Sequence, residues 1–377
     1  MATQFPRLRL PTENMKAHSA ATKLQKNGEP NTLNNAAPPG IPVTLMTGDG
    51  IGAEITAALV QTFSALGSPF LWEPAAIGLK AYSDFGDPLP SMTVESFAKN
   101  GLAIKGPVET PLITGFKSPL VRLRTQFQLY ANLRPARNWI IERKSRPVDI
   151  VLVRENTEGL YAAAESYIAV GDDPHGMAIA TTWNSRRGCE QILRFAFDYA
   201  RRHKRHKVTV VHKANVLKIL SGIFLETSRE LYRNEYAEQF EIEEMIVDAC
   251  AMKMAMEPSQ FDVIVTTNMF GDILSDLAAG VSGGLGLAPG ANIGRDAALF
   301  EAVHGSAPKI AGKGIANPVA LLLSGAMLLD HVGKTELSFR LRRSINKTLN
   351  RDRIRTPDIG GTASCADITA AIISRLD

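Results

Sequence analysis

Residues 261–276 read FDVIVTTNMFGDILSD, and this stretch decides the fold class. It begins with Phe261–Val265, a short apolar run that is typical of a strand buried on both faces of a sheet. Two threonines and an asparagine follow, and Asp272–Val281 is then predicted to be a helix. A buried strand that leads into a helix is the building unit of α/β proteins.

The same alternation of short apolar runs and helical stretches continues along the chain from Ile41. Further predicted strands are Val43–Met46, Val148–Val153 and Val208–Val211, and further predicted helices are Ala53–Leu66, Arg187–Arg202 and Ile219–Ala237. This alternation predicts an α/β architecture. Because no short-period repeat and no linker interrupts residues 41–377, any second domain is expected to be inserted rather than appended.

Length and composition exclude several classes of protein. With 377 residues, 45% of them hydrophobic and 21% charged, the chain can form one large or two ordinary globular domains. No apolar run approaches the roughly 20 residues of a membrane span, so an integral membrane protein is not expected. The cysteines Cys189, Cys250 and Cys365 lie far apart, which predicts neither a disulfide framework nor a zinc-ligand pair and favours a reducing compartment.

Most of the net charge of +4 lies in the first 40 residues. The body of the chain is therefore close to neutral, and nucleic acid is not an expected partner. Residues 1–40 are polar and end in Pro-Pro-Gly, and we interpret them as a disordered extension. Their basic composition also fits a mitochondrial targeting peptide, but Glu13 and Glu29 argue against one. A cytoplasmic location is expected, with the mitochondrial matrix as the alternative.

Three predicted strands run into polar residues at their carboxyl ends. The first is followed by Arg154, the second by His212 and Lys213, and the third by Thr266 and the segment leading to Asp272. Ligands of open α/β sheets bind outside the carboxyl ends of the strands, so the sequence predicts one shared site there.

Several residues in these segments are candidates for binding and catalysis. Asp272 and Asp276 lie four apart, on one face of the predicted helix, and with Asp248 they form a plausible site for a hard divalent cation. The alternative is that they are helix N-terminal acids favoured by the helix dipole. Lys213 could act as a base or pair with an acid, and Tyr161 could donate a proton or pack.

Arginines and glycines suggest how anions could be held. Arg122, Arg124, Arg134 and Arg154 are candidates for binding carboxylates, and only one of the first two should face a common site because they lie two apart in a predicted helix. Gly48–Gly52 follows the first strand, but its spacing is that of an ordinary tight turn as much as of a dinucleotide loop. His304 follows a glycine-rich stretch and could contact a ligand or be structural.

Eight segments together resemble one known family. They are GDGIGAE (48–54), LYANLRP (129–135), VRENTEGLY (153–161), VHKAN (211–215), MIVD (245–248), TTNMFGDILSD (266–276), EAVHGSAPKIAGKGIANP (301–318) and TPDIGG (356–361). In this order they are similar to the isocitrate/isopropylmalate dehydrogenases, a family of metal-dependent β-decarboxylating dehydrogenases, and most of all to NAD-type isocitrate dehydrogenases. The resemblance covers residues from about 41 to 377.

The resemblance implies an isopropylmalate dehydrogenase-like α/β fold. A large domain would be built from both chain ends, residues 41–137 and 295–377. A smaller inserted domain, residues 138–294, would carry substrate, metal and dimer contacts. The protein would be a homodimer or a higher homo-oligomer with active sites shared between subunits, in which Lys213 and Asp248 reach the site of a second copy.

The resemblance also implies a role for each matching residue. Tyr161 and Lys213 would be catalytic, and Ser118, Arg124, Arg134 and Arg154 would bind a tricarboxylate or a related 2-hydroxy acid. Asp248, Asp272 and Asp276 would hold Mg²⁺ or Mn²⁺. The nicotinamide cofactor would be lined by Thr110, Asn215, His304, Gly305, Ala307, Lys309 and Asn317.

Substrate and cofactor are less closely defined. The implied reaction is the oxidative decarboxylation of isocitrate to 2-oxoglutarate and CO₂, but Leu120 stands where these enzymes have an asparagine, so homoisocitrate and 3-isopropylmalate stay open. Lys309 is typical of NADP-dependent members of the family. Their other contacts to the cofactor phosphate are replaced here by Ile310, Pro357 and Gly361. NAD is therefore the expected cofactor, and NADP is the alternative. A non-catalytic regulatory subunit is a further alternative, which the presence of Tyr161 and Lys213 disfavours.

Overall fold

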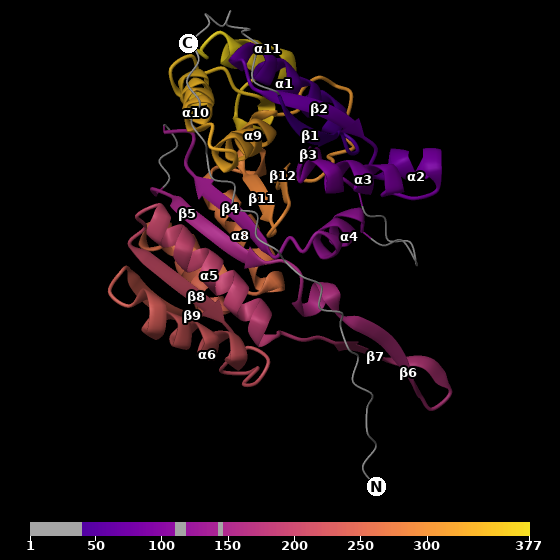
Figure 1. Cartoon of the computed structure of the whole chain (residues 1–377), viewed down its shortest axis with the longest axis vertical. Helices are drawn as coiled ribbons and strands as arrows, with labels where there is room; N and C mark the ends of the chain where they lie inside the picture. Colours follow the sequence, from indigo (N-terminus) through magenta and orange to yellow (C-terminus); the bar gives the residue numbers. More distant parts are fainter. Residues whose placement is uncertain (1–39, 110–117, 142–145) are drawn as a thin grey trace, which may run out of the picture. The chain divides into compact units, whose positions relative to one another are not determined.

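The computed structural model of the chain describes residues 40–109, 118–141 and 146–377 (Figure 1). The strands are β1 (Ile41–Met46), β2 (Phe70–Ala75), β3 (Leu102–Lys105), β4 (Ala131–Arg137), β5 (Asp149–Glu155), β6 (Ala164–Val170), β7 (Asp173–Thr181), β8 (Lys207–His212), β9 (Glu241–Ile246), β10 (Val263–Thr266), β11 (Pro289–Ile293) and β12 (Ala298–Ala302). The α-helices are α1 (Gly52–Leu66), α2 (Leu79–Phe85), α3 (Ser91–Asn100), α4 (Pro119–Gln126), α5 (Arg186–Arg202), α6 (Gly222–Leu231), α7 (Val247–Met256), α8 (Asn268–Ser282), α9 (Val319–His331), α10 (Thr335–Asn350) and α11 (Cys365–Ile373).

One ten-stranded sheet organises residues 40–377. Its strand order is β2-β1-β3-β12-β11-β4-β5-β10-β8-β9. The first four strands are parallel to one another, and so are the last four. Between them β11 and β4 pair antiparallel to their neighbours, so the two parallel halves run in opposite directions. This mixed sheet with helices confirms the predicted α/β fold.

Strands from both ends of the chain meet in one half of the sheet. β12 pairs with β3, with Glu301 in register with Lys105. In the other half, Thr266 of β10 is in register with Arg154 of β5, and β10 also pairs with β8. The carboxyl ends of β5, β8 and β10 therefore lie at one edge of the sheet, as the sequence predicted.

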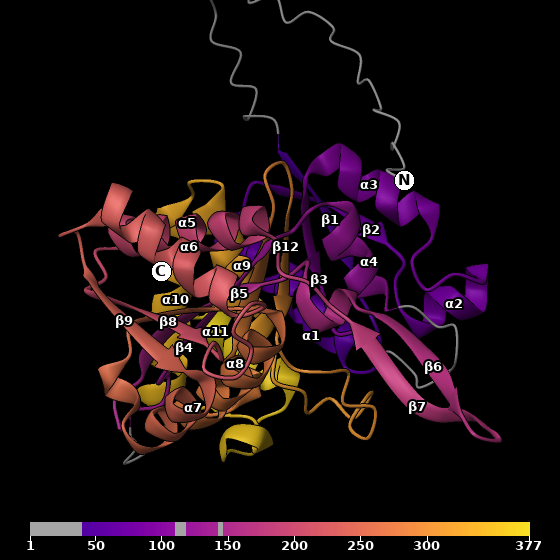
Figure 2. The same cartoon turned by 90° about the horizontal axis from the view of Figure 1, so that it is seen from below.

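Both faces of the second half are covered by helices, which explains its continuous apolar strands. Val151 and Val153 pack in a cluster with Ile192 and Phe197 of α5. Their neighbours in β5, such as Leu152, pack on the opposite face with residues of α7 and α8. A strand buried on both faces needs apolar residues on both of them. In Figures 1 and 2, α5 and α6 lie across β8 and β5.

The first half packs around α9. This helix, VALLLSGAMLLDH, is buried at all of its first eleven positions and packs on β11 and β12 and against α1 and α10. A helix that is apolar on all sides belongs inside a core. None of the helices within the described ranges is long and apolar enough to cross a membrane.

The glycines of the first strand–helix turn serve close backbone packing. A Cβ at Gly48 would lie 2.0 Å from the carbonyl oxygen of Pro107, and one at Gly50 would lie 2.0 Å from that of Ser306. Both glycines have positive φ angles, which residues with a side chain rarely adopt. The turn therefore brings the loops after β3 and β12 together.

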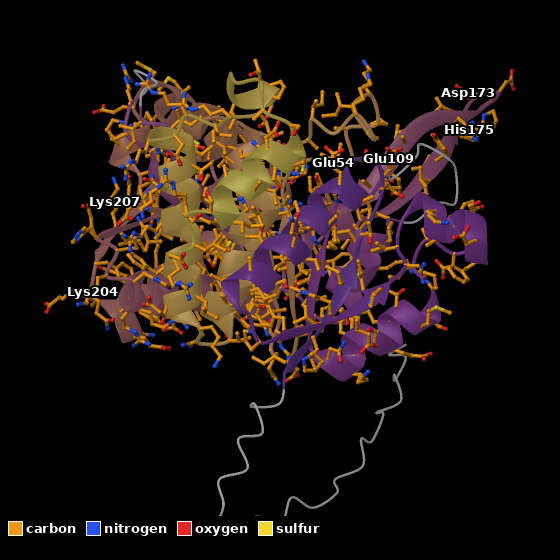
Figure 3. The ribbon with its side chains drawn as sticks, turned by 90° about the horizontal axis from the view of Figure 1, so that it is seen from above. Glu54, Glu109, Asp173, His175, Lys204 and Lys207 are labelled. Atoms are coloured by element: carbon orange, nitrogen blue, oxygen red, sulfur yellow. The ribbon has the colours of Figure 1, made fainter. Side chains whose placement is uncertain are left out.

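Some sequence-based predictions need correction. The helix predicted over Ile219–Ala237 begins later, at Gly222, and ends in a π-helical turn, Tyr232–Tyr236, because residues 213–221 form turns. The helix predicted from Asp272 begins four residues earlier, at Asn268, directly after the N-cap residue Thr267. The hairpin of β6 and β7 was not predicted; all residues of the two strands are exposed, and their apolar residues, such as Ile168 and Met177, do not alternate strictly with polar ones (Figure 3).

Residues 40–377 form one compact unit. The division into residues 41–137 with 295–377, and an inserted domain 138–294, stays a prediction. The predicted disordered extension lies outside the described residues, apart from Gly40. The three cysteines are buried and unpaired, as expected without a disulfide framework.

Candidate active site

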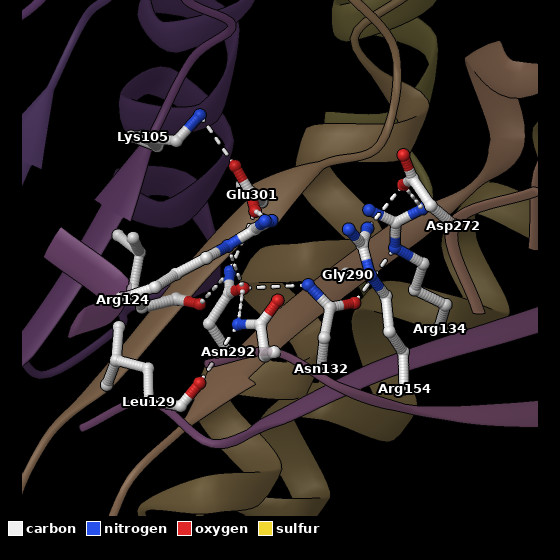
Figure 4. Close-up of polar contacts among 12 residues, drawn as sticks. Lys105, Arg124, Leu129, Asn132, Arg134, Arg154, Asp272, Gly290, Asn292 and Glu301 are labelled. Atoms are coloured by element: carbon white, nitrogen blue, oxygen red, sulfur yellow. Dashed lines mark hydrogen bonds and ion pairs between the residues drawn. The ribbon is translucent and has the colours of Figure 1, made fainter. Parts of the chain in front are cut away.

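A row of polar side chains crosses the middle of the sheet on one face, where the two parallel halves meet (Figure 4). Strand register aligns its members, which come from β3, β12, β11, β4 and β5: Lys105, Glu301, Asn292, Asn132, Arg134 and Arg154. Buried polar groups need hydrogen-bond partners, and here they supply them to one another. The row joins the two halves of the sheet through side chains as well as through the backbone.

Arg124 reaches this row from α4. Its Nε donates to Asn292 Oδ1 at 3.1 Å, and its Nη2 lies 3.4 Å from Glu301 Oε1. Arg122, two positions earlier, turns away and binds Asp87, with Nη2 3.1 Å from Oδ2. The prediction that only one of these two arginines faces the site is confirmed.

Glu301 is the buried negative charge of the row. Its Oε2 lies 2.6 Å from Lys105 Nζ, and both side chains are less than a tenth exposed. Burial alone would raise the pKa of Glu301, but Lys105 and Arg124 outweigh it and lower the pKa to about 2. The carboxylate is therefore ionised at neutral pH and fixes the two cations beside it.

Arg154 enters the site from the end of β5. It donates to Asn268 Oδ1 from Nε at 3.1 Å and from Nη2 at 2.8 Å. Its side chain passes over Gly271, where a Cβ would lie only 2.5 Å from Arg154 Cγ. The glycine in the FGD sequence thus makes room for the arginine, which is the largest fully buried side chain of the described residues.

Asp272, in the first turns of α8, binds two arginines and a tyrosine. It accepts hydrogen bonds from Arg154 Nη1 and Tyr161 Oη, and Arg134 Nη1 lies 3.2 Å from its Oδ1. Burial raises the pKa of Asp272, but Arg154 and Arg134 outweigh this effect and hold the pKa below its usual range. Burial and the hydrogen bond to Asp272 raise the pKa of Tyr161, so its hydroxyl keeps its proton at neutral pH.

The site carries an excess of positive charge. Burial, together with the charges of Arg134 and Arg124, lowers the pKa of Arg154 to about 10. Arg154 therefore stays protonated at neutral pH, and its charge is repelled by those of Arg134 and Arg124. An anion with several carboxylates would relieve this repulsion, and arginine forks suit carboxylate oxygens.

Asp276 lies one helical turn beyond Asp272. Its Oδ1 is 3.6 Å from Arg134 Nη1, and its side chain is 58% exposed. Burial and the neighbouring Asp272 raise the pKa of Asp276. Two carboxylates on one helix face, one of them exposed, are oxygen donors of the kind that Mg²⁺ and Mn²⁺ prefer, so they fit part of a cation site.

Lys213 and Asp248 form a separate ion pair. Lys213 follows β8, where its backbone N–H donates to Ser221 Oγ at 2.9 Å, and Asp248 lies in the first turn of α7. The hydrogen bond from Lys213 lowers the pKa of Asp248. Across the described ranges, this pair makes no contact with Asp272 or Asp276. No group of three His, Cys, Asp or Glu side chains in these ranges is placed to hold a metal ion. The predicted metal triad thus stays a prediction that needs a second copy.

Several predicted cofactor residues border the same region. His304 and Gly305 line a cavity of about 140 Å³ together with Leu120, Arg124 and Arg134. His304 Nδ1 lies 3.0 Å from Gly305 O, whereas its Nε2 is buried without a partner among the described residues. Burial lowers the pKa of His304, so the ring is neutral at pH 7. An unpaired ring nitrogen beside an open glycine fits a hydrogen bond to a bound nucleotide.

The remaining predicted cofactor residues differ in their surroundings. Asn317 donates to Asp358 Oδ2 at 3.0 Å, and Ala307 has a positive φ of 44° in the turn after Gly305. Lys309 and Asn215 are exposed, and Ser118 is half-buried at the start of α4. Thr110 lies outside the described residues.

Residues 42–372 match a protein family described as isocitrate/isopropylmalate dehydrogenase. The chain belongs to this family. A homoisocitrate dehydrogenase from Methanocaldococcus jannaschii is 42% identical over 346 residues, which cover 88% of this chain and 96% of that relative. The α subunit of mitochondrial NAD isocitrate dehydrogenase from Homo sapiens is 42% identical over 338 residues, covering 89% and 90%.

The fold of this dehydrogenase also matches solved structures of the family. A crystal structure of isocitrate dehydrogenase from Methylococcus capsulatus superposes with a TM-score of 0.85 at 49% identity. The match covers 89% of this chain and 99% of that one. The isopropylmalate dehydrogenase-like fold expected from the sequence is therefore confirmed.

Sequence reasoning missed the amides of this dehydrogenase's site. Asn132, Asn156, Asn268 and Asn292 bind the arginines or one another, and each is less than a twentieth exposed. A signal was present for Asn292, which lies between the apolar residues Ala291 and Ile293 in β11. A polar residue within a buried strand indicates a specific hydrogen-bonding role.

Proposed function

We propose that this dehydrogenase oxidises isocitrate to 2-oxoglutarate and CO₂ with reduction of NAD. The observation that carries the proposal is the convergence of Arg124, Arg134 and Arg154 on the side of the sheet where Asp272 lies (Figure 4). Tyr161 donates a hydrogen bond to this Asp272. The arginines suit a substrate with several carboxylates, and the tyrosine is a proton donor placed beside them.

The chain's own residues would perform binding and proton transfer. Arg124, Arg134 and Arg154 would hold and orient the substrate carboxylates that are retained. Lys213 would remove the proton of the substrate hydroxyl, and Tyr161 would deliver a proton to C3 after the third carboxylate has left as CO₂. Asp272 would orient the tyrosine hydroxyl through the hydrogen bond that it accepts.

Two further groups would supply the remaining chemistry. Asp272 and Asp276, with Asp248 of a second copy, would hold Mg²⁺ or Mn²⁺, and the nucleotide would lie along His304, Gly305 and Asn317. When bound, the nucleotide would supply the hydride acceptor and the divalent ion would supply Lewis acidity. This arrangement requires a homodimer, because Lys213 and Asp248 are remote from the arginines of their own chain.

Homoisocitrate is the second candidate substrate. The relatives from M. jannaschii and H. sapiens are equally similar to this chain although their names differ in substrate. Leu120 lines the cavity beside Arg124 and offers an apolar wall where a longer substrate chain would lie. 3-Isopropylmalate, with a branched apolar group, is the third candidate.

Initial rates of nicotinamide reduction test the proposal. Isocitrate, homoisocitrate and 3-isopropylmalate are each offered with Mn²⁺ and with either NAD or NADP. We expect the highest kcat/KM with isocitrate and NAD. Homoisocitrate or NADP as the better partner would correct the substrate or cofactor assignment, and absence of turnover with every pair would favour a regulatory subunit.

A lysine pair separates chemistry from folding in the same assay. Lys213→Ala should lower kcat by a factor of about 100 or more, as expected for loss of a general base. Lys204→Ala is the matched control, because Lys204 is exposed on the loop before β8 and points into solvent in Figure 3. Equal activity of both variants would contradict the role assigned to Lys213.

A further inference from the structure

Asn292 lies at the centre of the polar row and is fully buried. It sits on β11, between β12 and β4, with no exposed surface. Its amide oxygen accepts from Arg124 Nε at 3.1 Å, Asn132 Nδ2 at 2.7 Å and Asn156 Nδ2 at 2.9 Å, and its amide nitrogen donates to Glu301 Oε1 at 2.7 Å and Leu299 O at 3.3 Å. No other amide in the described part of the chain has so many partners in this site.

These partners fix the orientation of the amide. Three N–H donors face its oxygen, and two acceptors, one of them the Glu301 carboxylate, face its nitrogen. A flipped amide would place its N–H groups against the donors and its oxygen against the carboxylate. The side chain therefore has one allowed state, and what it binds is held in one position.

Asn292 reaches two of the three arginines. It holds Arg124 directly through Nε, which leaves the outer guanidinium nitrogens for other partners. It holds Arg134 through one intermediate, because Asn132 donates to Asn292 and its Oδ1 accepts from Arg134 Nε at 2.8 Å. Each guanidinium is thus held at its Nε by an amide, Arg124 by Asn292 itself and Arg134 by Asn132, which is bound to Asn292.

We propose that Asn292 is a positioning residue that orients Arg124 and Arg134 toward the carboxylates of the hydroxy acid; this rests on the proposed function. Arg124, Asn132 and Arg134 line the cavity, whereas Asn292 lies behind them without exposed surface. It does not touch the substrate, and its influence runs through the arginines. Carboxylate binding by an arginine fork depends on the plane of the guanidinium, so a tilt of either plane weakens substrate binding.

The test compares two asparagine variants. Asn292→Ala removes the shared acceptor and should raise KM for the hydroxy acid by a factor of about 10 to 100, because a misplacement of about 1 Å can cost 100-fold. KM for NAD should stay within about twofold of the wild-type value, since the change lies on the carboxylate side. Asn138→Ala is the matched control: it loses bonds to Val148 and Ser282 beyond the end of β4 and should change neither KM.

Coupling to Arg124 distinguishes positioning from a general structural role. If Asn292 acts through Arg124, the double variant should raise KM for the hydroxy acid by less than the product of the fold increases in Asn292→Ala and Arg124→Ala. A fold increase in the double variant that equals this product would overturn the inference. So would an Asn292→Ala enzyme whose KM values for the acid and for NAD both match wild type, or both rise equally.

A second variant covers failure of Asn292→Ala to fold. Asn132→Ala keeps the bond from Arg124 to Asn292 and removes the branch to Arg134, including the bond that Asn132 donates to Asn292. It should raise KM for the acid several-fold without changing KM for NAD, and unchanged values would overturn this branch of the inference. Failure of the proposed function is distinguishable, because the wild-type enzyme would then turn over none of the three acids.

Discussion

Replacing Glu301 by glutamine measures how much one buried charge stabilises the junction of the two sheet halves. Glu301 lies 2.6 Å from Lys105 with both side chains buried, and Arg124 lies on its other side. Glutamine keeps the shape and one acceptor oxygen but removes the charge. Lys105 would then be a buried cation without its partner carboxylate.

The pKa of Glu301 gives the expected magnitude. It is lowered from 4.5 to about 2 in the folded protein. At about 1.4 kcal/mol per pKa unit, this corresponds to about 3 kcal/mol of folding free energy at neutral pH. Removing one partner of a buried ion pair typically costs about 3–5 kcal/mol, which agrees. Because the pKa is lower in the folded state, the contribution is complete above about pH 4.5 and is lost as the pH falls toward 2.

Urea unfolding at a series of pH values tests this expectation. At pH 7, Glu301→Gln should unfold at a clearly lower urea concentration than wild type, with an unchanged slope. The difference should shrink as the pH is lowered from 4.5 toward 2, since Glu301 then takes up a proton in the unfolded wild-type chain while it stays ionised in the folded protein. Adding Lys105→Met to Glu301→Gln should restore part of the loss, because the unpaired cation is gone.

Glu73→Gln is the matched control. Hydrogen bonds from Lys99, Ser96 and Asn100 also lower the pKa of Glu73 to about 2, but this carboxylate is exposed at the protein surface. Water screens such a pair, so the urea midpoint should not change. An unchanged midpoint for Glu301→Gln at pH 7, or a loss that stays constant down to pH 2, would refute the reasoning.

Three further predictions concern the active site. Gly271→Ala should lower kcat/KM for the hydroxy acid about 100-fold, because its Cβ would displace Arg154; Gly280→Ala in the same helix, with open space around it, should have wild-type rates. Tyr161→Phe should lower kcat by a factor of about 100 with little change in KM, measured by CO₂ release, since the proton donor is lost. A chelator should abolish turnover, and added Mn²⁺ should restore it. Asp276→Asn should raise the Mn²⁺ concentration needed for half the maximal rate. Turnover that is insensitive to the chelator would contradict the metal assignment.

The sequence specified the strands of the second half well because both of their faces are covered. Val208–Val211 and Val148–Val153 are apolar at all positions but Thr209 and Asp149, and no other element type fits such short runs between turns. The hairpin of β6 and β7 could not be found in this way, since a ribbon without a buried face has no apolar alternation. The start of α6 was missed because Lys218–Ser221 has helical propensity but forms turns.

The site was predictable residue by residue but not as a network. Arg154, Asp272 and Tyr161 came from motifs and do lie together. The partners Asn292 and Glu301 were not assigned, because their role depends on strand register between segments far apart in sequence. The predicted role of Lys213 and Asp248 in the site of a second copy stays a prediction, because in this chain the two residues bind each other.

The pairing of β3 with β12 has a consequence for synthesis of the protein. β3 ends at Lys105 and its neighbour begins at Ala298, about 200 residues later, so a ribosome working at about 5–20 residues per second leaves β3 with an open edge for roughly 10–40 seconds. An unpaired apolar edge strand invites pairing with other chains. We therefore expect the nascent N-terminal portion to be prone to wrong pairing until the last strand of the sheet emerges.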